Sequence, residues 1–96
     1  MKKTFFVYIL TNPRNSVLYT GITNNLTKRV SQHSTSALPS FTKKYQMKKL
    51  IYYEMFDSAY GAIRREKQIK GGSRRRKVEL INKINPNWED LSHRLF

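Results

Sequence analysis

The chain of 96 residues contains no cysteine, only two histidines and only six acidic residues. The absence of cysteine excludes disulfide bonds and thiolate metal sites, and two histidines are too few for a histidine-based metal site. No apolar run approaches the roughly 20 residues of a membrane-spanning helix. The sequence also lacks a Walker phosphate-binding loop, a serine-triad pattern, internal repeats and low-complexity segments.

Positive charge is what the sequence has in excess. Nineteen Lys and Arg residues outnumber the acidic residues and give a formal net charge of +13. Such an excess is costly to hold together without a polyanion, and it predicts nucleic acid as the partner. An anionic membrane surface is a weaker alternative, because no basic amphipathic helix with an aromatic stripe stands out. We therefore expect a nucleic-acid partner and no membrane partner.

The length predicts a single domain, residues 1–96, with one modest core. The first ten residues superficially resemble a signal peptide, because a basic start precedes an apolar run. That run is short, lacks a cleavage site and ends at Asn12-Pro13-Arg14. We therefore expect a first strand here and a cytoplasmic protein; the oligomeric state is left open.

Two short apolar runs near the N-terminus predict a β-hairpin. Phe5–Leu10 and Val17–Ile22 are rich in aromatic and β-branched residues, the first more than the second, and such residues favour strands. The polar segment Thr11–Ser16 between them contains Asn12-Pro13, which begins turns well. We expect two strands joined by a loop slightly longer than the minimum.

Alternation of side chains along these strands places one tyrosine on each. On one face of the first strand it groups Phe6, Tyr8 and Leu10. On one face of the second strand it groups Val17, Tyr19 and Gly21. Gly21 has no side chain, so a ligand backbone can come close to it.

A helix is expected from Asn25 to about His33, capped by Thr23 or Asn24. Arg29 and His33 lie four residues apart and therefore share a face of this helix. An arginine and a histidine that point the same way just after the second strand can form a phosphate-facing pair. The alternative is an ordinary solvated helix face.

An irregular loop is expected over residues 34–45, where Phe41 and Tyr45 bracket Lys43 and Lys44. Aromatic and basic residues that alternate in this way suit stacking on bases and pairing with phosphates. The aromatic residues can equally serve to attach the loop to the core. Under the first interpretation, Lys43 and Lys44 contact nucleic acid.

The segment Lys49–Phe56 is strongly apolar and predicts a third strand, central in the sheet or well covered. Tyr52, Tyr53 and Glu54 within it are candidates for a functional role. Packing in the core and the sheet explains these three residues more simply.

A second helix is expected from Ala59 to about Lys70, capped by Asp57-Ser58. Four residues form its apolar stripe: Ala59, Ala62, Ile63 and Ile69. Glu66 falls near the middle of that stripe. An ionised carboxylate there needs a partner, because burying an unpaired charge is expensive. The partner is either a metal ion or a base such as Arg29.

Gly71-Gly72-Ser73 interrupts that helix, and Ser73 can cap another one that Asn85-Pro86 stops. The third helix has an apolar face made of Val78, Leu80, Ile81 and Ile84. Its first turns carry three consecutive arginines, Arg74, Arg75 and Arg76. Positive charge opposes the dipole at a helix N-terminus, which favours a phosphate-gripping patch over a solvated helix start. In the tail that follows, Trp88 is expected to fold back on the core.

The order and spacing of these motifs resemble the GIY-YIG nuclease superfamily, in particular its small, stand-alone bacterial branch. The name motif corresponds to Phe6-Val7-Tyr8 and Tyr19-Thr20-Gly21, in which the two tyrosines and the final glycine match. The match then extends over nearly the whole chain: Asn24, Leu26, Arg29, His33, Phe41–Tyr45, Leu50–Glu54, Ala62–Lys70, Asn85-Pro86, Trp88 and Asp90-Leu91. Two departures are Gly71-Gly72, where relatives usually have Gly-Trp, and Ile22, where some carry lysine.

The resemblance implies an α/β (α+β) fold, a three-stranded antiparallel sheet flanked by helices. It also implies phosphodiester cleavage, in DNA by preference, that depends on Mg²⁺ or Mn²⁺ and uses no small-molecule cofactor. By resemblance, Glu66 is the metal ligand and Arg29 stabilises the phosphate. Tyr8, Tyr19 and His33 line the site, and one of these three activates the attacking water.

The resemblance also implies close backbone packing at Gly21 and a functional asparagine late in the fold, for which Asn82 and Asn85 are the candidates. A nucleic-acid-binding protein with this fold and little catalysis fits the charge equally well. The complete set of site residues favours the enzyme, because a pure binder has no use for a carboxylate that repels phosphate. A structural basic protein is the third alternative. With no appended recognition domain, we do not expect high sequence specificity.

Overall fold

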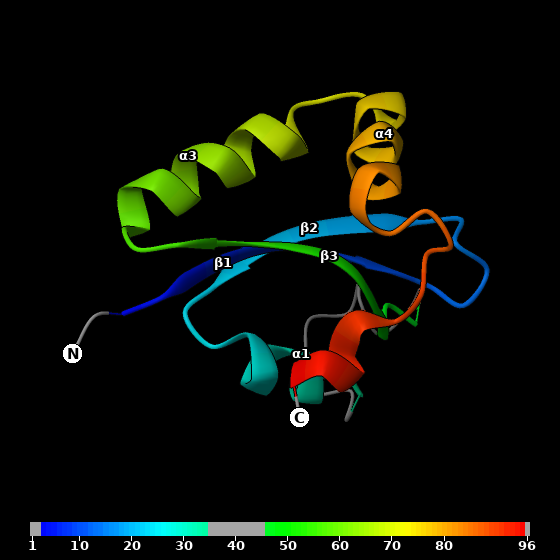
Figure 1. Cartoon of the computed structure of the whole chain (residues 1–96), viewed down its shortest axis with the longest axis horizontal. Helices are drawn as coiled ribbons and strands as arrows, with labels where there is room; N and C mark the ends of the chain where they lie inside the picture. Colours follow the sequence, from blue (N-terminus) through cyan, green and yellow to red (C-terminus); the bar gives the residue numbers. More distant parts are fainter. Residues whose placement is uncertain (1–2, 35–45, 96) are drawn as a thin grey trace.

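The computed structural model describes residues 3–34 and 46–95, and a three-stranded antiparallel sheet lies at its centre (Figure 1). The strands are β1 (Phe5–Thr11), β2 (Leu18–Thr23) and β3 (Lys49–Phe56). The predicted hairpin and third strand are confirmed. The strand order is β2-β1-β3, so β3 is an edge strand. Of the two positions predicted for it, central in the sheet or well covered by other elements, only the second remains.

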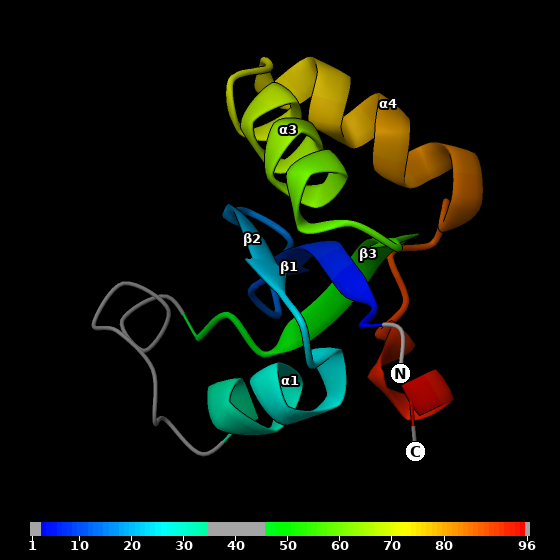
Figure 2. The same cartoon turned by 90° about the vertical axis from the view of Figure 1, so that its left-hand side faces the viewer.

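Helices cover both faces of the sheet, which confirms the predicted α+β architecture (Figures 1 and 2). On one face lie α3 (Ala59–Lys70) and α4 (Arg74–Ile84). On the other face lie α1 (Leu26–Ser34) and the short 3₁₀ helix η1 (Leu91–Leu95). None of the helices within the described ranges is long and apolar enough to cross a membrane.

The central strand β1 is buried on both sides because each layer of helices covers one set of its alternating side chains. Val7 and Ile9 belong to the cluster beneath α3 and α4. Tyr8 and Leu10 belong to the cluster that packs against α1 and η1. The core is therefore split by the sheet into two layers, and Tyr8 lies in the layer of α1.

The helix α3 has a narrower buried face than its sequence predicts. Ser58 caps it by accepting a hydrogen bond from the Gly61 amide at 3.0 Å, as expected. Ala62 and Ile69 are buried, whereas Ala59 and Ile63 are exposed. The predicted four-residue stripe is therefore wrong at two positions. Ile63 lies about 100° around the helix from Ala62, which turns it away from the sheet.

The helix α1 begins one residue later than predicted, and its cap is neither Thr23 nor Asn24. The side chain of Asn25 accepts a hydrogen bond from the Lys28 amide at 3.0 Å, which is the N-cap geometry. The Thr23 hydroxyl instead accepts from the Asn25 amide at 3.1 Å and tightens the preceding turn. The prediction missed the cap because Thr23, Asn24 and Asn25 all have side chains that can cap a helix, and the sequence alone does not show which of them does.

The helix α4 begins and ends as predicted. Ser73 accepts a hydrogen bond from the Arg76 amide at 3.2 Å, and Asn85 closes the helix. On its expected apolar face, Ile81 is fully buried but Ile84 is 59% exposed. The last turn of α4 therefore extends past the core.

Asn85 and Asn82 hold the C-terminal tail in place. The buried Asn85 amide donates to the carbonyls of Ile51 at 3.0 Å and Glu89 at 2.9 Å, and its oxygen accepts from the Glu89 amide at 3.0 Å. Asn82 accepts a hydrogen bond from the Trp88 indole at 2.7 Å, and Trp88 packs on the core as predicted. Both asparagines thus have structural partners.

Candidate active site

Tyr8 and Gly21 are directly paired across β1 and β2. A Cβ placed on Gly21 would lie 2.5 Å from the Tyr8 hydroxyl oxygen and 2.6 Å from Tyr8 Cζ, which is closer than non-bonded atoms allow. The Tyr8 ring therefore occupies the space that the missing side chain leaves. The sequence predicted that a ligand backbone can come close to Gly21; in the structure it is the Tyr8 side chain that comes close to it.

Tyr8, Tyr19 and Arg29 gather on the face of the sheet that α1 covers. The rings of Tyr8 and Tyr19 have their centroids 6.3 Å apart and are tilted by 47°. Arg29 and Tyr19 are half-buried, and Tyr8 is buried. These three residues come from β1, β2 and α1, which the hairpin and the turn after β2 bring together.

Burial raises the pKa of the Tyr8 phenol above its usual value, and the neighbouring Tyr19 raises it further. Arg29 acts in the opposite direction and offsets only part of this rise. At Tyr8, burial thus outweighs the positive charge of Arg29. Tyr8 is therefore a neutral hydroxyl near pH 7, suited to donating a hydrogen bond rather than to removing a proton.

Three other predicted site residues fall wholly or partly outside the described residues. His33 belongs to α1, one turn beyond Arg29, but its side chain is not among those that the structure describes. Lys43 and Lys44 lie outside the described ranges altogether. The roles assigned to these residues stay predictions.

Glu66 lies on α3, in the layer opposite Tyr8 and Arg29. It is half-buried, and within residues 3–34 and 46–95 no ion pair or hydrogen bond of its carboxylate is found. A pair with Arg29, the alternative left open by the sequence, is accordingly absent from this part of the chain. The carboxylate has no protein partner there that accounts for its position.

The direction in which Glu66 points follows from its neighbour Arg65. Arg65 reaches Glu54 on the edge strand β3. Successive residues of a helix are separated by about 100°, and the buried line through Ala62 and Ile69 passes between Arg65 and Glu66. Glu66 therefore faces the other way, toward β2, because β2 lies on the far side of β1 from β3. Glu66 and the tyrosines thus approach β2 from opposite faces of the sheet.

A polar network that sequence reasoning did not assemble lies on the same face as Glu66. The Glu54 carboxylate accepts a hydrogen bond from the Tyr52 hydroxyl and two from Arg65, whose Nε and Nη2 approach it at 3.1 and 3.0 Å. A further Arg65 nitrogen donates to Gln68 at 2.7 Å. Burial and the hydrogen bond with Glu54 raise the pKa of Tyr52. Tyr52 and Glu54 are two apart on a strand, a spacing that signals a shared face, but Arg65 is brought to them only by docking of α3.

The three consecutive arginines at the start of α4 have different surroundings. Arg74 donates to the hairpin-loop carbonyls of Ser16 at 3.1 Å and Asn15 at 3.3 Å. Arg75 forms an exposed ion pair with Glu79. Of the three, only the side chain of Arg76 has no hydrogen bond or ion pair within the described residues. Arg76 is thus the arginine best placed to serve a ligand.

Comparison with known proteins identifies the family. The sequence profile of the GIY-YIG catalytic domain matches residues 4–85. A UPF0213 protein of Syntrophus aciditrophicus is 43% identical over 82 residues, which cover 84% of this chain and 92% of that protein. A UPF0213 protein of Staphylococcus haemolyticus is 41% identical over 76 residues, covering 79% of this chain and 92% of that protein.

The fold also matches a solved relative. The solution NMR structure of a UPF0213 protein from Bacillus halodurans superposes with a TM-score of 0.58 at 29% identity, over 91% of this chain and 92% of that chain. The profile match includes the segments that contain Tyr8, Tyr19 and Gly21. The chain belongs to the GIY-YIG family, among its small proteins of the UPF0213 type.

Proposed function

We propose that the protein is a divalent-metal-dependent endonuclease that hydrolyses phosphodiester bonds in nucleic acid, with DNA as the preferred substrate. Family membership supports nuclease chemistry. The observation that carries the proposal is the arrangement around β2: Tyr8, Tyr19 and Arg29 lie on one face of this edge strand, and Glu66 turns toward it from the other. A phosphate laid against the β2 edge meets both sets of groups.

Each side chain in this arrangement has a chemical role that its surroundings support. Arg29 pairs with the phosphate and stabilises the charge that develops on it. Tyr8 stays protonated and donates a hydrogen bond to the same group. Activation of the water falls to Tyr19 or His33, and we assign it to His33, because an imidazole with an ordinary pKa of about 6.5 accepts a proton near neutral pH.

Glu66 is the residue that would hold the metal ion. No group of three or more His, Asp or Glu side chains occurs in the described part of the chain, which excludes an all-protein cage there. A single carboxylate fits Mg²⁺, because that ion keeps several waters and takes one or two carboxylates besides substrate oxygens. The buried Thr20 hydroxyl, on the same sheet face as Glu66, has no hydrogen-bond partner within the described residues and can accept or donate to such waters. When bound, the ion supplies Lewis-acid polarisation of the phosphate.

Low sequence specificity is part of the proposal. The net charge of +13 provides contacts to phosphates, and phosphate contacts position a nucleic acid without reading its sequence. Binding of this kind weakens steeply as salt rises. We therefore expect many sequences to be cut at low salt, with differences set by the shape of the substrate.

The test is cleavage of labelled single-stranded, duplex and branched DNA, with matched RNA, in Mg²⁺, Mn²⁺ or EDTA. Wild type is compared with Glu66→Gln, which keeps the size of the side chain and removes its charge. Glu79→Gln is the matched control, because it removes an equal charge from an exposed pair on α4. Binding of each substrate is measured in parallel in Ca²⁺ or EDTA.

Metal-dependent cutting that falls at least about a hundredfold in Glu66→Gln, with binding retained and Glu79→Gln unaffected, supports the proposal. Binding of all substrates without cutting, unchanged or tightened by Glu66→Gln, contradicts it. That outcome would make the protein a nucleic-acid-binding module that keeps the nuclease fold.

A further inference from the structure

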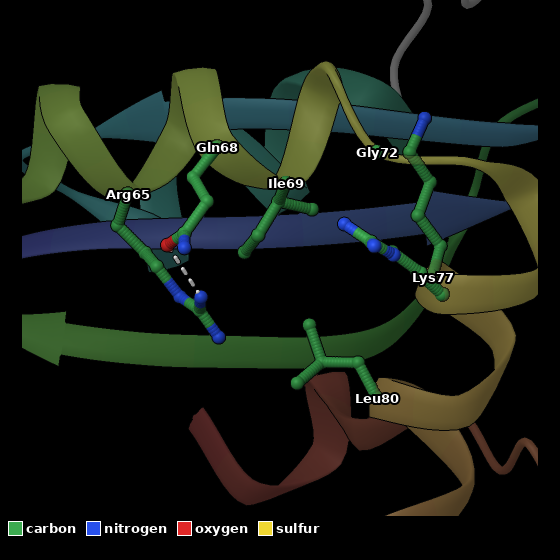
Figure 3. A pocket seen from close by; sticks show the side chains of 7 residues that line it. Arg65, Gln68, Ile69, Gly72, Lys77 and Leu80 are labelled. Atoms are coloured by element: carbon green, nitrogen blue, oxygen red, sulfur yellow. Dashed lines mark hydrogen bonds between the residues drawn. The ribbon is translucent and has the colours of Figure 1, made fainter.

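A pocket of about 160 Å³ opens between α3 and α4, on the face of the sheet opposite Tyr8 (Figure 3). Its wall is apolar and consists of Ile69, Leu80 and the backbone of Gly72. Three basic side chains stand around it, Arg65 from α3 and Arg76 and Lys77 from α4. Ligand sites are usually lined mainly by apolar groups with a few polar ones among them, and this pocket has that composition.

The pocket exists because α3 and α4 separate at two glycines. The Gly71 amide bonds to the Lys67 carbonyl at 2.9 Å and the Gly72 amide to the Ile69 carbonyl at 3.1 Å, which closes the last turn of α3 before α4 begins at Arg74. No side chain projects from Gly72 into the gap between the helices. A Cβ placed there would lie 3.3 Å from the Ile69 carbonyl oxygen, 3.6 Å from the Gln68 carbonyl oxygen and 3.9 Å from Arg76 Cβ, so a side chain at position 72 would fit with a small adjustment.

The three basic residues differ in how far their charge is compensated. Arg65 is fixed by Glu54 and donates to Gln68 (Figure 3), so it presents an oriented but largely neutralised edge. Neither Arg76 nor Lys77 has a side-chain hydrogen bond or ion pair within the described residues. The pocket therefore carries about two uncompensated positive charges beside an apolar wall.

We propose that this pocket binds one nucleotide unit, with its phosphate against Arg76 and Lys77 and its base against Ile69 and Leu80. Pockets that enclose drug-sized ligands measure about 300–1,000 Å³; because this one is smaller, it would hold the base of a single unit and leave the phosphate at its rim. The guanidinium planes at the rim can stack on a base. The site lies in the α3–α4 layer, away from Tyr8 and Arg29, and binding there requires no cleavage.

The binding test is a titration of the ¹⁵N-labelled protein, followed through backbone amide shifts in two-dimensional NMR. The probes are thymidine monophosphate, inorganic phosphate, thymidine and an eight-residue oligothymidylate. The proposal predicts that the amides of Ile69, Gly72 and Leu80 shift with the monophosphate, while that of Gly21 does not. Inorganic phosphate and thymidine should each bind at least about tenfold more weakly, because each lacks one half of the ligand.

Two kinds of variant locate the site. The double variant Arg76→Gln with Lys77→Gln should weaken monophosphate binding at least about tenfold, because charge-assisted hydrogen bonds to the phosphate are lost. Its matched control is Lys70→Gln with Lys83→Gln, which removes the same charge from exposed positions of α3 and α4 outside the pocket. Gly72→Trp places a side chain in the pocket and should abolish binding while the protein stays folded, as checked by its spectrum.

The source of the nucleotide is decided by the oligonucleotide. Binding of oligothymidylate at the same amides, and its loss in Gly72→Trp, assigns the pocket to a strand of nucleic acid; binding of the monophosphate alone assigns it to free nucleotides. Absence of shifts at Ile69 and Gly72, or an equal loss in the control double variant, overturns the proposal. So does equal affinity for inorganic phosphate. Because no readout uses cleavage, failure here leaves the endonuclease proposal standing, and an inactive protein can still bind the nucleotide.

Discussion

The Tyr8 ring stands where a side chain at Gly21 would be, with its hydroxyl oxygen 2.5 Å from the position of a Cβ on that residue. The two residues face each other across β1 and β2. Tyr8 belongs to a buried cluster that includes Leu10 and Leu26, and its ring lies beside that of Tyr19. The absence of a side chain at position 21 thus leaves the space that the Tyr8 hydroxyl occupies.

Gly21→Ala should displace the Tyr8 ring. The added methyl group overlaps a side chain that is buried and cannot withdraw freely, so we expect a loss of about 1–3 kcal/mol in the free energy of unfolding. Urea unfolding at pH 7 measures it. Gly61→Ala is the control, because its Cβ would meet only the Ser58 hydroxyl at 3.1 Å and the Phe56 ring at 3.6 Å. Equal stability of Gly21→Ala and wild type would show that Tyr8 has room to move.

The raised pKa of Tyr8 and of Tyr52 predicts incomplete ionisation of the tyrosines at high pH. Burial disfavours the charged phenolate at both residues, so at about pH 11, one unit above the ordinary tyrosine pKa, both should still be protonated in the folded protein. Absorbance of tyrosinate near 295 nm, in native and denaturing buffer, measures this. We expect Tyr8→Phe to leave the native signal unchanged while lowering the denatured signal by one of the six tyrosines.

The same shift makes stability depend on pH in a defined direction. A tyrosine whose pKa is raised by folding holds its proton in the folded state after the unfolded chain has lost it. Its contribution to stability is complete below about pH 10 and is lost as pH rises toward the raised pKa. Between pH 9 and 11 the free energy of unfolding should therefore fall less steeply in Tyr8→Phe than in wild type. A parallel fall in both would contradict the burial of the Tyr8 phenol.

Much of the fold follows from local sequence features, and the parts that do not are set by tertiary packing. The hairpin, the third strand and the ends of α3 and α4 could be predicted from strand formers, Asn-Pro turns and serine caps. The position of β3 at an edge could not, because strand order depends on how distant segments pair. Ile63 on α3 is exposed for a related reason, since periodicity gives a stripe but not its width.

The candidate site is predictable to a similar degree. Alternation predicts that Tyr8 shares a face of its strand with Leu10, and Tyr19 a face of its strand with Val17, and the structure confirms both groupings. That the two faces coincide, and that Arg29 joins them through α1, depends on strand register and helix docking. That Glu66 approaches from the opposite layer depends on which side of the sheet α3 covers, and no local pattern carries this information. The pairing of Glu54 with Arg65 depends on the same docking step.

Glu54→Gln should destabilise the fold more than Glu79→Gln, which removes the carboxylate of the other ion pair described here. The Glu54 side chain is 25% exposed and accepts hydrogen bonds from Tyr52 and Arg65. Its neutralisation leaves the Arg65 guanidinium, which is only 28% exposed, without a counter-charge. We expect a loss of about 1–3 kcal/mol. Glu79→Gln is the matched control, because its pair with Arg75 is 64–88% exposed and is worth less than about 1 kcal/mol.

Urea unfolding of both variants at pH 7 gives the comparison, and 1 M salt provides a second one. High salt screens the exposed pair of Glu79 more than the partly buried pair of Glu54, so the deficit of Glu54→Gln should persist in salt. Equal, small effects of the two substitutions would mean that the network on β3 contributes no more than a surface ion pair.

Tyr8→Phe separates the two roles that a site tyrosine can have in the proposed cleavage reaction. Because burial keeps Tyr8 protonated, its role is to donate a hydrogen bond, and its removal should lower kcat about 10²–10³-fold, as for other donors to a developing oxyanion. The shape of the pH–rate profile should stay the same, because Tyr8 does not titrate near neutral pH. His33→Gln, by contrast, should remove the acidic limb of the profile. If Tyr8→Phe instead abolished that limb, Tyr8 would be the group that accepts the proton from water, and the metal ion would have to lower its pKa far enough to overcome its burial.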